Sequence, residues 1–327
     1  MGIRSDFLAY PLLFTSYYKQ TVWGGRRMGE VLHWDVPETC QPCGEAWEIC
    51  DRPAVQSVVT NGVYAGKTLG ELRMAAPGAL VAPGFSGPSF PLLVKVIDAA
   101  VNLSVQVHPD AAACQKLGHG AEAKTEMWYI LEAQEDAVVY AGLRPGVTRE
   151  QFAAVNGGDG VVEMVSRFAT RPGDVFFIPA GTVHTIGAGN LLLEIQQNSD
   201  TTYRIYDWGR MGIDGRPREL HCEAAMETID FAGGSAICQP TESGPEICPT
   251  LADCEFFHCR RLNIRREFGD STLRTRSFHL ISALDRACAV TANGVSIVLD
   301  RGRTCLLPAA TGDYTVTGAA AVLQTEG

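Results

Sequence analysis

The sequence has no long apolar run and no excess of basic residues, and these two absences exclude whole classes of function. No stretch of the 327 residues approaches 18 consecutive apolar residues, so we expect no membrane-spanning helix. Residues 1–7 also lack the apolar run of a signal peptide. Lys and Arg number 27 against 37 Asp and Glu, and the net charge is −10. Nucleic-acid and anionic-membrane binding need a basic surface, so we expect neither partner.

Paired cysteine motifs are scarce as well. The chain has 11 cysteines, an odd number at irregular spacings, and its one Cys-x-x-Cys, formed by Cys40 and Cys43, has no second such pair. A disulfide framework or a zinc ribbon needs cysteines at paired, regular spacing. Reduced thiols are typical of the cytoplasm, and we therefore expect a cytoplasmic protein.

What the sequence does contain indicates a β protein. Hydrophobic residues make up 46% of the chain, which is typical of globular proteins, and the length suggests about two domains. Between about residues 85 and 200, short apolar segments alternate with Gly and Pro, a spacing that favours an all-β sandwich or barrel. The clearest predicted strands are 91–97, 103–108, 127–131, 137–141, 175–178 and 191–196.

Short helices are predicted to interrupt these strands. Asp110 can cap the Ala-rich turn that follows it, and Thr148 with Gln151 fits a capping box. Residues 219–230 predict a third short helix.

A change of composition suggests where the first domain ends. Residues 233–250 are rich in Gly, Ser and Pro, which is typical of a linker. We predict a first domain over residues 1–235, a linker over 236–250 and a β domain over 251–327.

The second domain contains an echo of the first. Gly173 and Gly302 each stand six residues before a proline, and the two aligned copies end at His184 and Asp313. Since Asp313 stands where the first copy has histidine, we expect two related β units with a metal only in the first. Chance similarity of two Gly/Pro turns is the alternative.

Strict alternation in residues 103–108 separates two faces of a predicted strand. Ser104, Gln106 and His108 share one face, while the apolar residues share the other. A solvent-exposed polar face explains such a pattern unless other strands supply complementary ligands.

Two further segments supply such ligands. Lys124 and Glu126, two residues apart, project to the same side at the start of a strand, and a Pro-Ala-Gly turn precedes His184. The imidazoles of His108 and His184 and the carboxylate of Glu126, with the Gln106 carbonyl available, form a mixed nitrogen and oxygen set that suits zinc or another divalent transition metal. The other histidines are interpreted as structural: His33, His119, His221, His258 and His279.

A family resemblance joins these motifs. The segment from Gly173 to His184 resembles the second motif of cupins, which are small metal-binding β barrels. Where cupins usually have His-x-His, this chain has Gln106-x-His108, and the sequence LSVQVHP followed by KTEM resembles class I mannose-6-phosphate isomerases in their short bacterial form. The resemblance covers about residues 10–230 and includes WGG at 23–25 and GEAWE at 44–48.

The resemblance implies a fold and a metal site. The fold is mainly β, a cupin-type jelly-roll barrel with short helical insertions, plus a smaller, degenerate cupin-like β domain without metal. The cofactor is one zinc ion per chain, and its implied ligands are Gln106, His108, Glu126 and His184.

The resemblance also implies a reaction, the interconversion of mannose 6-phosphate and fructose 6-phosphate through a metal-assisted cis-enediol. The family has Glu and Arg ten residues apart around a Ser-Asp, here Glu194 and Arg204, although Thr201 stands where the family usually has Asn. Arg204 suits stabilisation of negative charge or phosphate contact. Lys124 and Glu194 are both candidates for the proton-transferring base.

Substrate contacts are expected from Lys124, Arg204 and Ser104. The alternatives to this function are an isomerase of another sugar phosphate, a non-catalytic sugar-phosphate-binding cupin and a metal-dependent oxygenase. Each single residue also has a structural interpretation: Lys124 as a solvated lysine at a strand end, and Glu194 as the ion-pair partner of Arg204. Nothing in the sequence specifies an oligomeric state.

Overall fold

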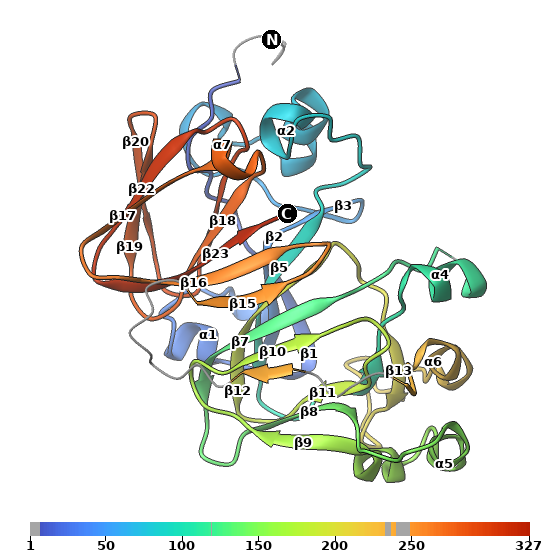
Figure 1. Cartoon of the computed structure of the whole chain (residues 1–327). Helices are drawn as coiled ribbons and strands as arrows, with labels where there is room; N and C mark the ends of the chain where they lie inside the picture. The colour runs from blue at the N-terminus through green and yellow to red at the C-terminus, as the bar shows by residue number, and fades with distance from the viewer. Residues whose placement is uncertain (1–6, 119, 233–236, 240–248) are drawn as a thin grey trace. The chain divides into compact units, whose positions relative to one another are not determined.

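Strands dominate the protein, as Figure 1 shows for a computed structural model that describes residues 7–118, 120–232, 237–239 and 249–327. The mainly β fold class predicted from the sequence is confirmed. The predicted linker at 236–250 lies largely outside the described residues, as does His119. No helix in the described residues is both long enough and apolar enough to span a membrane.

The chain folds into two compact units, each built from separated segments. Unit 1 comprises residues 1–17, 47–95 and 242–327, and unit 2 comprises residues 18–46 and 96–241. The division falls inside three strands, after the first residue of β1 (Tyr17–Gly25) and within β2 (Cys43–Ile49) and β5 (Leu92–Ala99). The sequence-based domain boundaries remain a prediction.

The sequence motifs that suggested a metal site lie in or beside the strands of two sheets. The seven-stranded sheet has the order β1 (Tyr17–Gly25), β2, β5, β12 (Asn190–Gln197), β7 (Glu126–Ala133), β10 (Val175–Ile178) and β14 (Ile237–Gln239). The five-stranded sheet has the order β13 (Tyr203–Tyr206), β6 (Val105–Val107), β11 (His184–Ile186), β8 (Val138–Leu143) and β9 (Val165–Ala169). Every strand predicted between residues 91 and 196 is present, although β6 ends one residue before His108.

The core of unit 2 explains why these segments form strands. The inward residues of β7 and β10 alternate with period two, and Trp128, Ile130, Phe176 and Ile178 are all essentially inaccessible to solvent. Alternate residues of a strand lie on the same face, so this pattern also brings Glu126, two positions before Trp128, to the inner face. The register of the core therefore determines which polar side chains face inward.

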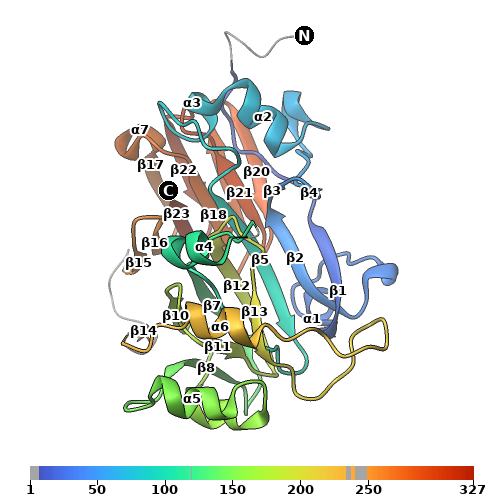
Figure 2. The same cartoon turned by 90° about the vertical axis from the view of Figure 1, so that its right-hand side faces the viewer.

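The helices predicted from capping signals are also present. The Asp110 side chain accepts a hydrogen bond from the Ala113 backbone N–H at the start of α4 (Ala111–Leu117), and Thr148 forms the capping box of α5 (Arg149–Val155). With α6 (Cys222–Thr228), these helices lie at one end of the unit 2 strands in both Figure 1 and Figure 2.

The remaining helices are short. They are α1 (Arg27–Glu30), η1 (Glu38–Cys40), η2 (Gly62–Tyr64), α2 (Leu69–Ala75), α3 (Pro77–Leu80), η3 (Asp159–Met164) and α7 (Thr272–Thr275). A two-stranded sheet pairs β3 (Asp51–Arg52) with β4 (Val55–Gln56).

The C-terminal segment forms two more sheets within unit 1. The first has the order β15 (Thr250–Asp253), β16 (His258–Ile264), β23 (Ala320–Glu326), β18 (His279–Ala283) and β21 (Thr304–Leu307). The second has the order β17 (Glu267–Ser271), β22 (Asp313–Thr317), β19 (Cys288–Ala292) and β20 (Val295–Leu299). The orders β23-β18-β21 and β17-β22-β19-β20 repeat the orders β12-β7-β10 and β6-β11-β8-β9, so the predicted echo is a repeat of topology.

One detail of the predicted echo is wrong. Asp313 is exposed, whereas the next residue, Tyr314, is 2% exposed and belongs to the core cluster of its sheet. Tyr314 therefore occupies the inward position that His184 occupies in unit 2. The turns before β11 and β22 both have five residues, 179–183 and 308–312, but β11 begins on an inward-facing residue and β22 on an outward-facing one. The equivalent positions are therefore offset by one residue, which moves a side chain to the opposite face.

Candidate metal centre and active site

Three buried side chains from three strands converge at one point. His108, Glu126 and His184 are at most 1% exposed, and each offers one ligand atom within 4.8 Å of the others. His108 follows β6, Glu126 begins β7 and His184 begins β11, so two sheets contribute. The three residues expected as candidate ligands are therefore brought together, and the group can hold a metal ion.

Backbone carbonyls determine how both imidazoles are oriented. His108 Nδ1 lies 2.9 Å from the Thr201 carbonyl oxygen, and His184 Nδ1 lies 2.9 Å from that of Thr182. A carbonyl oxygen can only accept a hydrogen bond, so each Nδ1 carries the proton and each Nε2 keeps a lone pair. Burial also lowers the pKa of His184 to about 4, which keeps this ring neutral, the form that binds metals.

Both Nε2 atoms lie close to the Glu126 carboxylate, and each also has a nitrogen donor 3.2 Å away, Lys124 Nζ for His108 and Gln106 Nε2 for His184. Nε2 of His108 lies 3.5 Å from Glu126 Oε2, and Nε2 of His184 lies 3.4 Å from Oε1. Oε1 is buried and has no hydrogen-bond donor among the described residues. Such an arrangement of acceptors is costly in a low-dielectric interior unless a cation lies among them, and the donor set therefore fits a divalent transition metal.

Lys124 supplies one positive charge to this group. Its Nζ lies 2.7 Å from Glu126 Oε2 and 3.2 Å from His108 Nε2, and the side chain is about 5% exposed. The two-residue spacing from Glu126 correctly predicted that both side chains lie on the same side. Lys124 is buried at the metal-ligand cluster and is not a solvated lysine at a strand end.

Gln106 lies beside the histidines through strand register. It is directly opposite His184 in the β6–β11 pair, and its Nε2 lies 3.2 Å from His184 Nε2. The Ser104 hydroxyl donates to Gln106 Oε1 at 3.2 Å. A hydroxyl can also accept, so rotation of the amide would turn Oε1 toward His184 without loss of the Ser104 contact. Ser104 thus contacts Gln106, and Gln106 faces the cluster.

Glu194 occupies the inner face of the seven-stranded sheet. It pairs with Trp128 across β12 and β7, and the Trp128 indole N–H donates to Glu194 Oε2 at 3.0 Å. The ring of Trp128 also packs edge-on against that of His184, with centroids 5.4 Å apart. Trp128 thus contacts both a candidate base and a candidate ligand.

Arg204 extends the row of Gln106 and His184. It is directly opposite Gln106 in the β6–β13 pair, its Nη1 donates to the Glu219 carbonyl at 2.7 Å, and its buried Nε has no acceptor among the described residues. The Arg204 backbone N–H donates to His221 Nδ1 at 3.0 Å. Burial, with a smaller contribution from Arg218, lowers the pKa of Arg204 from its usual high value.

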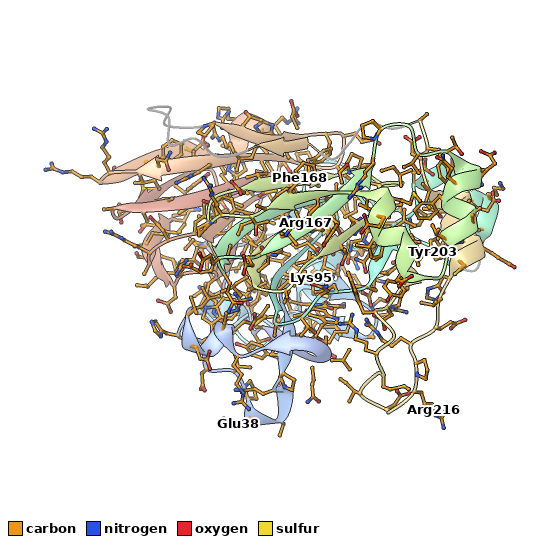
Figure 3. The ribbon with its side chains drawn as sticks, turned by 90° about the horizontal axis from the view of Figure 1, so that it is seen from below. Glu38, Lys95, Arg167, Phe168, Tyr203 and Arg216 are labelled. Carbon is orange, nitrogen blue, oxygen red and sulfur yellow. The ribbon has the colours of Figure 1, made fainter. Side chains whose placement is uncertain are left out.

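The segment after β13 contains basic residues that the sequence analysis missed. Asp207 bridges Arg210 and Arg218, with 2.8 Å to Arg210 Nη2 and 2.5 Å to Arg218 Nη2. The density of arginine between residues 204 and 218 was the available signal. Figure 3 shows Tyr203 close to the helices of unit 2 and Arg216 at the tip of this segment. Arg210 and Arg218 thus lie near enough to Arg204 to affect its pKa, together with the carboxylates of Asp207 and Glu219.

The remaining described histidines have structural partners or lie outside the cluster. His258 Nδ1 lies 3.4 Å from Asp253, and the two ring nitrogens of His279 contact Thr275 and Tyr314. The interpretation of these residues as structural agrees with these contacts. His221 differs from these two histidines because it lies beside a candidate site residue: it accepts a hydrogen bond from the Arg204 backbone N–H.

Comparisons with known proteins agree on one family. Residues 12–152 match the family model for the catalytic domain of type I phosphomannose isomerase, and residues 248–325 match that for the cupin domain of mannose-6-phosphate isomerase. A probable mannose-6-phosphate isomerase of Bacillus subtilis is 34% identical, covering 95% of this chain and 97% of its own length. A mannose-6-phosphate isomerase of Streptococcus mutans is 39% identical, covering 92% and 93%.

Solved structures show the same likeness. The crystal structure of the mannose 6-phosphate isomerase from Bacillus subtilis superposes with a TM-score of 0.85 at 30% identity, covering 97% of this chain and 99% of that one. A more distant protein from Archaeoglobus fulgidus, at 21% identity and a TM-score of 0.75, shares the fold. The sequence, the fold and the His/Glu/His group thus agree, and the chain belongs to the type I phosphomannose isomerase family of aldose–ketose isomerases.

Proposed function

We propose that this chain interconverts mannose 6-phosphate and fructose 6-phosphate with one zinc ion held by Gln106, His108, Glu126 and His184. The observation that carries the proposal is the buried acceptor cluster, in which two Nε2 lone pairs face the Glu126 carboxylate. A divalent ion bound there would polarise the oxygens at C1 and C2 of the sugar.

The protein's own residues divide the remaining work. Arg204 stabilises the negative charge that develops on the enediol or contacts the phosphate, because its half-buried guanidinium stays charged at neutral pH. Arg210 and Arg218 add positive charge near Arg204, which favours an anionic substrate. Ser104 orients Gln106 and can contact the substrate.

Proton transfer between C1 and C2 needs a base on the inner face of the barrel. Lys124 and Glu194 both meet this condition, since each is buried, Glu194 belongs to β12, and Lys124 lies two residues before β7 and contacts Glu126. Lys124 contacts Glu126 directly, whereas Glu194 is held by the Trp128 indole. Glu194→Gln and Lys124→Met, compared in a C2 proton-exchange assay, distinguish the two roles: the variant that loses exchange identifies the base.

Catalysis is assigned to residues 1–235, with a linker at 236–250 and a metal-free cupin-like β domain at 251–327. The family match at 248–325 supports the last assignment. Nine cysteines in the described residues are free thiols, which supports a reducing, cytoplasmic compartment. Small sugar phosphates, and no nucleic acid or membrane, are the proposed partners.

A coupled isomerase assay tests the function. Activity on mannose 6-phosphate should be lost after chelation and return with zinc, while metal analysis reports one zinc per chain. His108→Ala should abolish both metal binding and turnover, and the matched control His258→Ala should change neither. Chelator-indifferent turnover would exclude the zinc proposal. Tight binding of mannose 6-phosphate without turnover in the zinc-loaded protein would indicate a sensor, and faster turnover of another sugar phosphate would change the substrate.

A further inference from the structure

We propose that Ser199 is a positioning residue that orients the metal ligand His108 through the backbone of Thr201. The inference rests on the metal site of the proposed function, but not on the identity of the sugar substrate. It concerns a short segment, residues 196–201, which we call the 196–201 clamp.

The contact between the clamp and the ligand is a single hydrogen bond. The Thr201 carbonyl accepts from His108 Nδ1 at 2.9 Å, across 93 residues of sequence. This bond determines which nitrogen of His108 keeps a lone pair and in which direction the ring plane lies. Any movement of the Thr201 peptide would therefore change the direction of His108 Nε2.

Two hydrogen bonds hold Thr201 in place. Its backbone N–H donates to Ser199 Oγ at 3.2 Å, and its Oγ1 accepts from the Glu122 backbone N–H at 3.0 Å. Ser199 is 1% exposed, and its hydroxyl donates in turn to the Glu122 carbonyl at 3.0 Å. The Ser199 hydroxyl thus joins two backbone segments, one of which carries the carbonyl that orients His108.

The other end of the clamp is attached to the sheet that carries Glu126. Gln196 is directly opposite Glu126 in the β7–β12 pair, and its Nε2 donates to the Ser199 carbonyl at 2.6 Å. The Thr125 backbone N–H donates to Gln197 Oε1 at 2.8 Å. The clamp is therefore held between the strand of one ligand, Glu126, and the ring of another, His108.

The second histidine shows why His108 needs such support. His184 Nδ1 donates to the Thr182 carbonyl, only two residues away, so its orientation is determined within its own turn. His108 has its carbonyl partner in a distant segment, whose position depends on the side chain of Ser199. Residues that orient a metal-binding histidine typically affect metal affinity by 10- to 100-fold when they are removed.

The test compares metal binding in Ser199→Ala with that in the parent protein and in Thr170→Val. Thr170 is a matched control because it is 5% exposed in the same unit and its hydroxyl donates to Asn190 Oδ1, away from the ligands. Competition with a chelating dye measures zinc affinity, and the visible absorption of the cobalt-loaded proteins reports ligand geometry. Neither readout uses sugar turnover, so failure of the isomerase proposal stays distinguishable from failure of this one.

We expect Ser199→Ala to bind zinc roughly 10- to 100-fold more weakly and to show a changed cobalt spectrum, while Thr170→Val matches the parent. Thr201→Val, which removes the hydroxyl but keeps the carbonyl, should weaken binding less. Combined with Ser199→Ala it should add little, because both act through one peptide. Parental zinc affinity and spectrum in Ser199→Ala, or an equal loss in Thr170→Val, would overturn the proposal. If Ser199→Ala does not fold, unchanged zinc affinity in Thr201→Val would overturn the proposal instead.

Discussion

The cluster of His108, Glu126 and His184 in unit 2 and the polar cluster of the C-terminal sheets occupy equivalent strand positions with different chemistry. In the first, His184 lies opposite Gln106, and in the second, Tyr314 lies opposite Asp270. Both rows continue to an alanine on the next strand of the sheet. The other sheet of each pair corresponds in the same way. Glu126 begins β7, the central strand of β12-β7-β10, and His279 begins β18, the central strand of β23-β18-β21.

The two clusters differ in how their polar atoms are satisfied. In unit 2, the Glu126 carboxylate faces two lone pairs and one lysine, which leaves room for a further cation. In the C-terminal cluster, Arg260 Nη2 lies 2.5 Å from Asp270 Oδ2, and the Arg260 Nε–H also donates to Gln324 Oε1.

Tyr314 and His279 complete the C-terminal cluster, with 2.8 Å between the Tyr314 hydroxyl and His279 Nδ1. A guanidinium that belongs to the chain satisfies the acceptors there. The comparison shows that the same arrangement of strands suits either a bound metal ion or the guanidinium of an arginine, depending on whether a strand supplies that arginine.

The largest expected effect comes from Arg204, which has no counterpart in the C-terminal cluster because β17 is an edge strand among the described residues. Arg204→Ala should lower turnover by roughly two to three orders of magnitude while zinc stays bound, by analogy with the removal of an oxyanion donor. Steady-state kinetics and metal analysis of the same sample measure this. Near-normal turnover would refute the role of Arg204.

The next largest expected effect is on stability and comes from Arg260, the positively charged residue of the C-terminal cluster. Arg260→Met should cost about 3 kcal/mol of unfolding free energy, the low end for a broken buried ion pair, since Arg274 still contacts Asp270. Urea unfolding measures the loss, and turnover of the folded variant should stay within about twofold of the parent. A large loss of turnover without a loss of stability contradicts the separation of the two clusters.

Trp128 should give a smaller effect on catalysis. Its counterpart at the equivalent position is Ile281, which has no side-chain donor. Trp128→Phe removes the indole donor to Glu194 and should lower turnover by roughly tenfold, because a hydrogen bond to a charged group contributes about 1.5–3 kcal/mol. In a Glu194→Gln background the same substitution should have little further effect, and full additivity would show that Trp128 does not act through Glu194.

The smallest expected effect is a change in acid stability. Burial opposes ionisation of Asp270, but hydrogen bonds from Arg274, Gln324 and the Ser271 backbone lower its pKa to about 2. A carboxylate with a lowered pKa stabilises the fold above its unfolded pKa of about 4, and this contribution is lost as the pH falls through about 2. Urea midpoints between pH 5 and pH 2 should fall less steeply in Asp270→Asn than in the parent. An identical slope would exclude this source of acid sensitivity.

Much of the site could be predicted from local patterns. Alternation in residues 103–108 placed Gln106 and His108 on one face, and the two-residue spacing of Lys124 and Glu126 placed them together. Period-two geometry is a property of any strand, so the face of a side chain can be read without knowledge of its neighbours. The family resemblance then indicated that these motifs belong to one site, because they occur along the chain in the order typical of the family.

The failures have a common cause. Asp313 was assigned the position that Tyr314 occupies, because an offset of one residue along a strand places a side chain on the opposite face, and the sequence does not show on which face a strand begins. The indole of Trp128 and the arginines after β13 were missed, because the Trp128 indole contacts Glu194 on another strand and the arginines are held by Asp207.

The sequence by itself therefore determined the β fold class, the capping of two helices and the residues able to bind a metal. Only the tertiary structure decided which carbonyl orients each imidazole, which acceptors stay without a donor and which cluster contains its own cation. The physical reason is the range of the interactions. Strand periodicity and helix capping act over a few residues, whereas the bond from His108 to Thr201 spans 93 residues and exists only once two sheets have packed together.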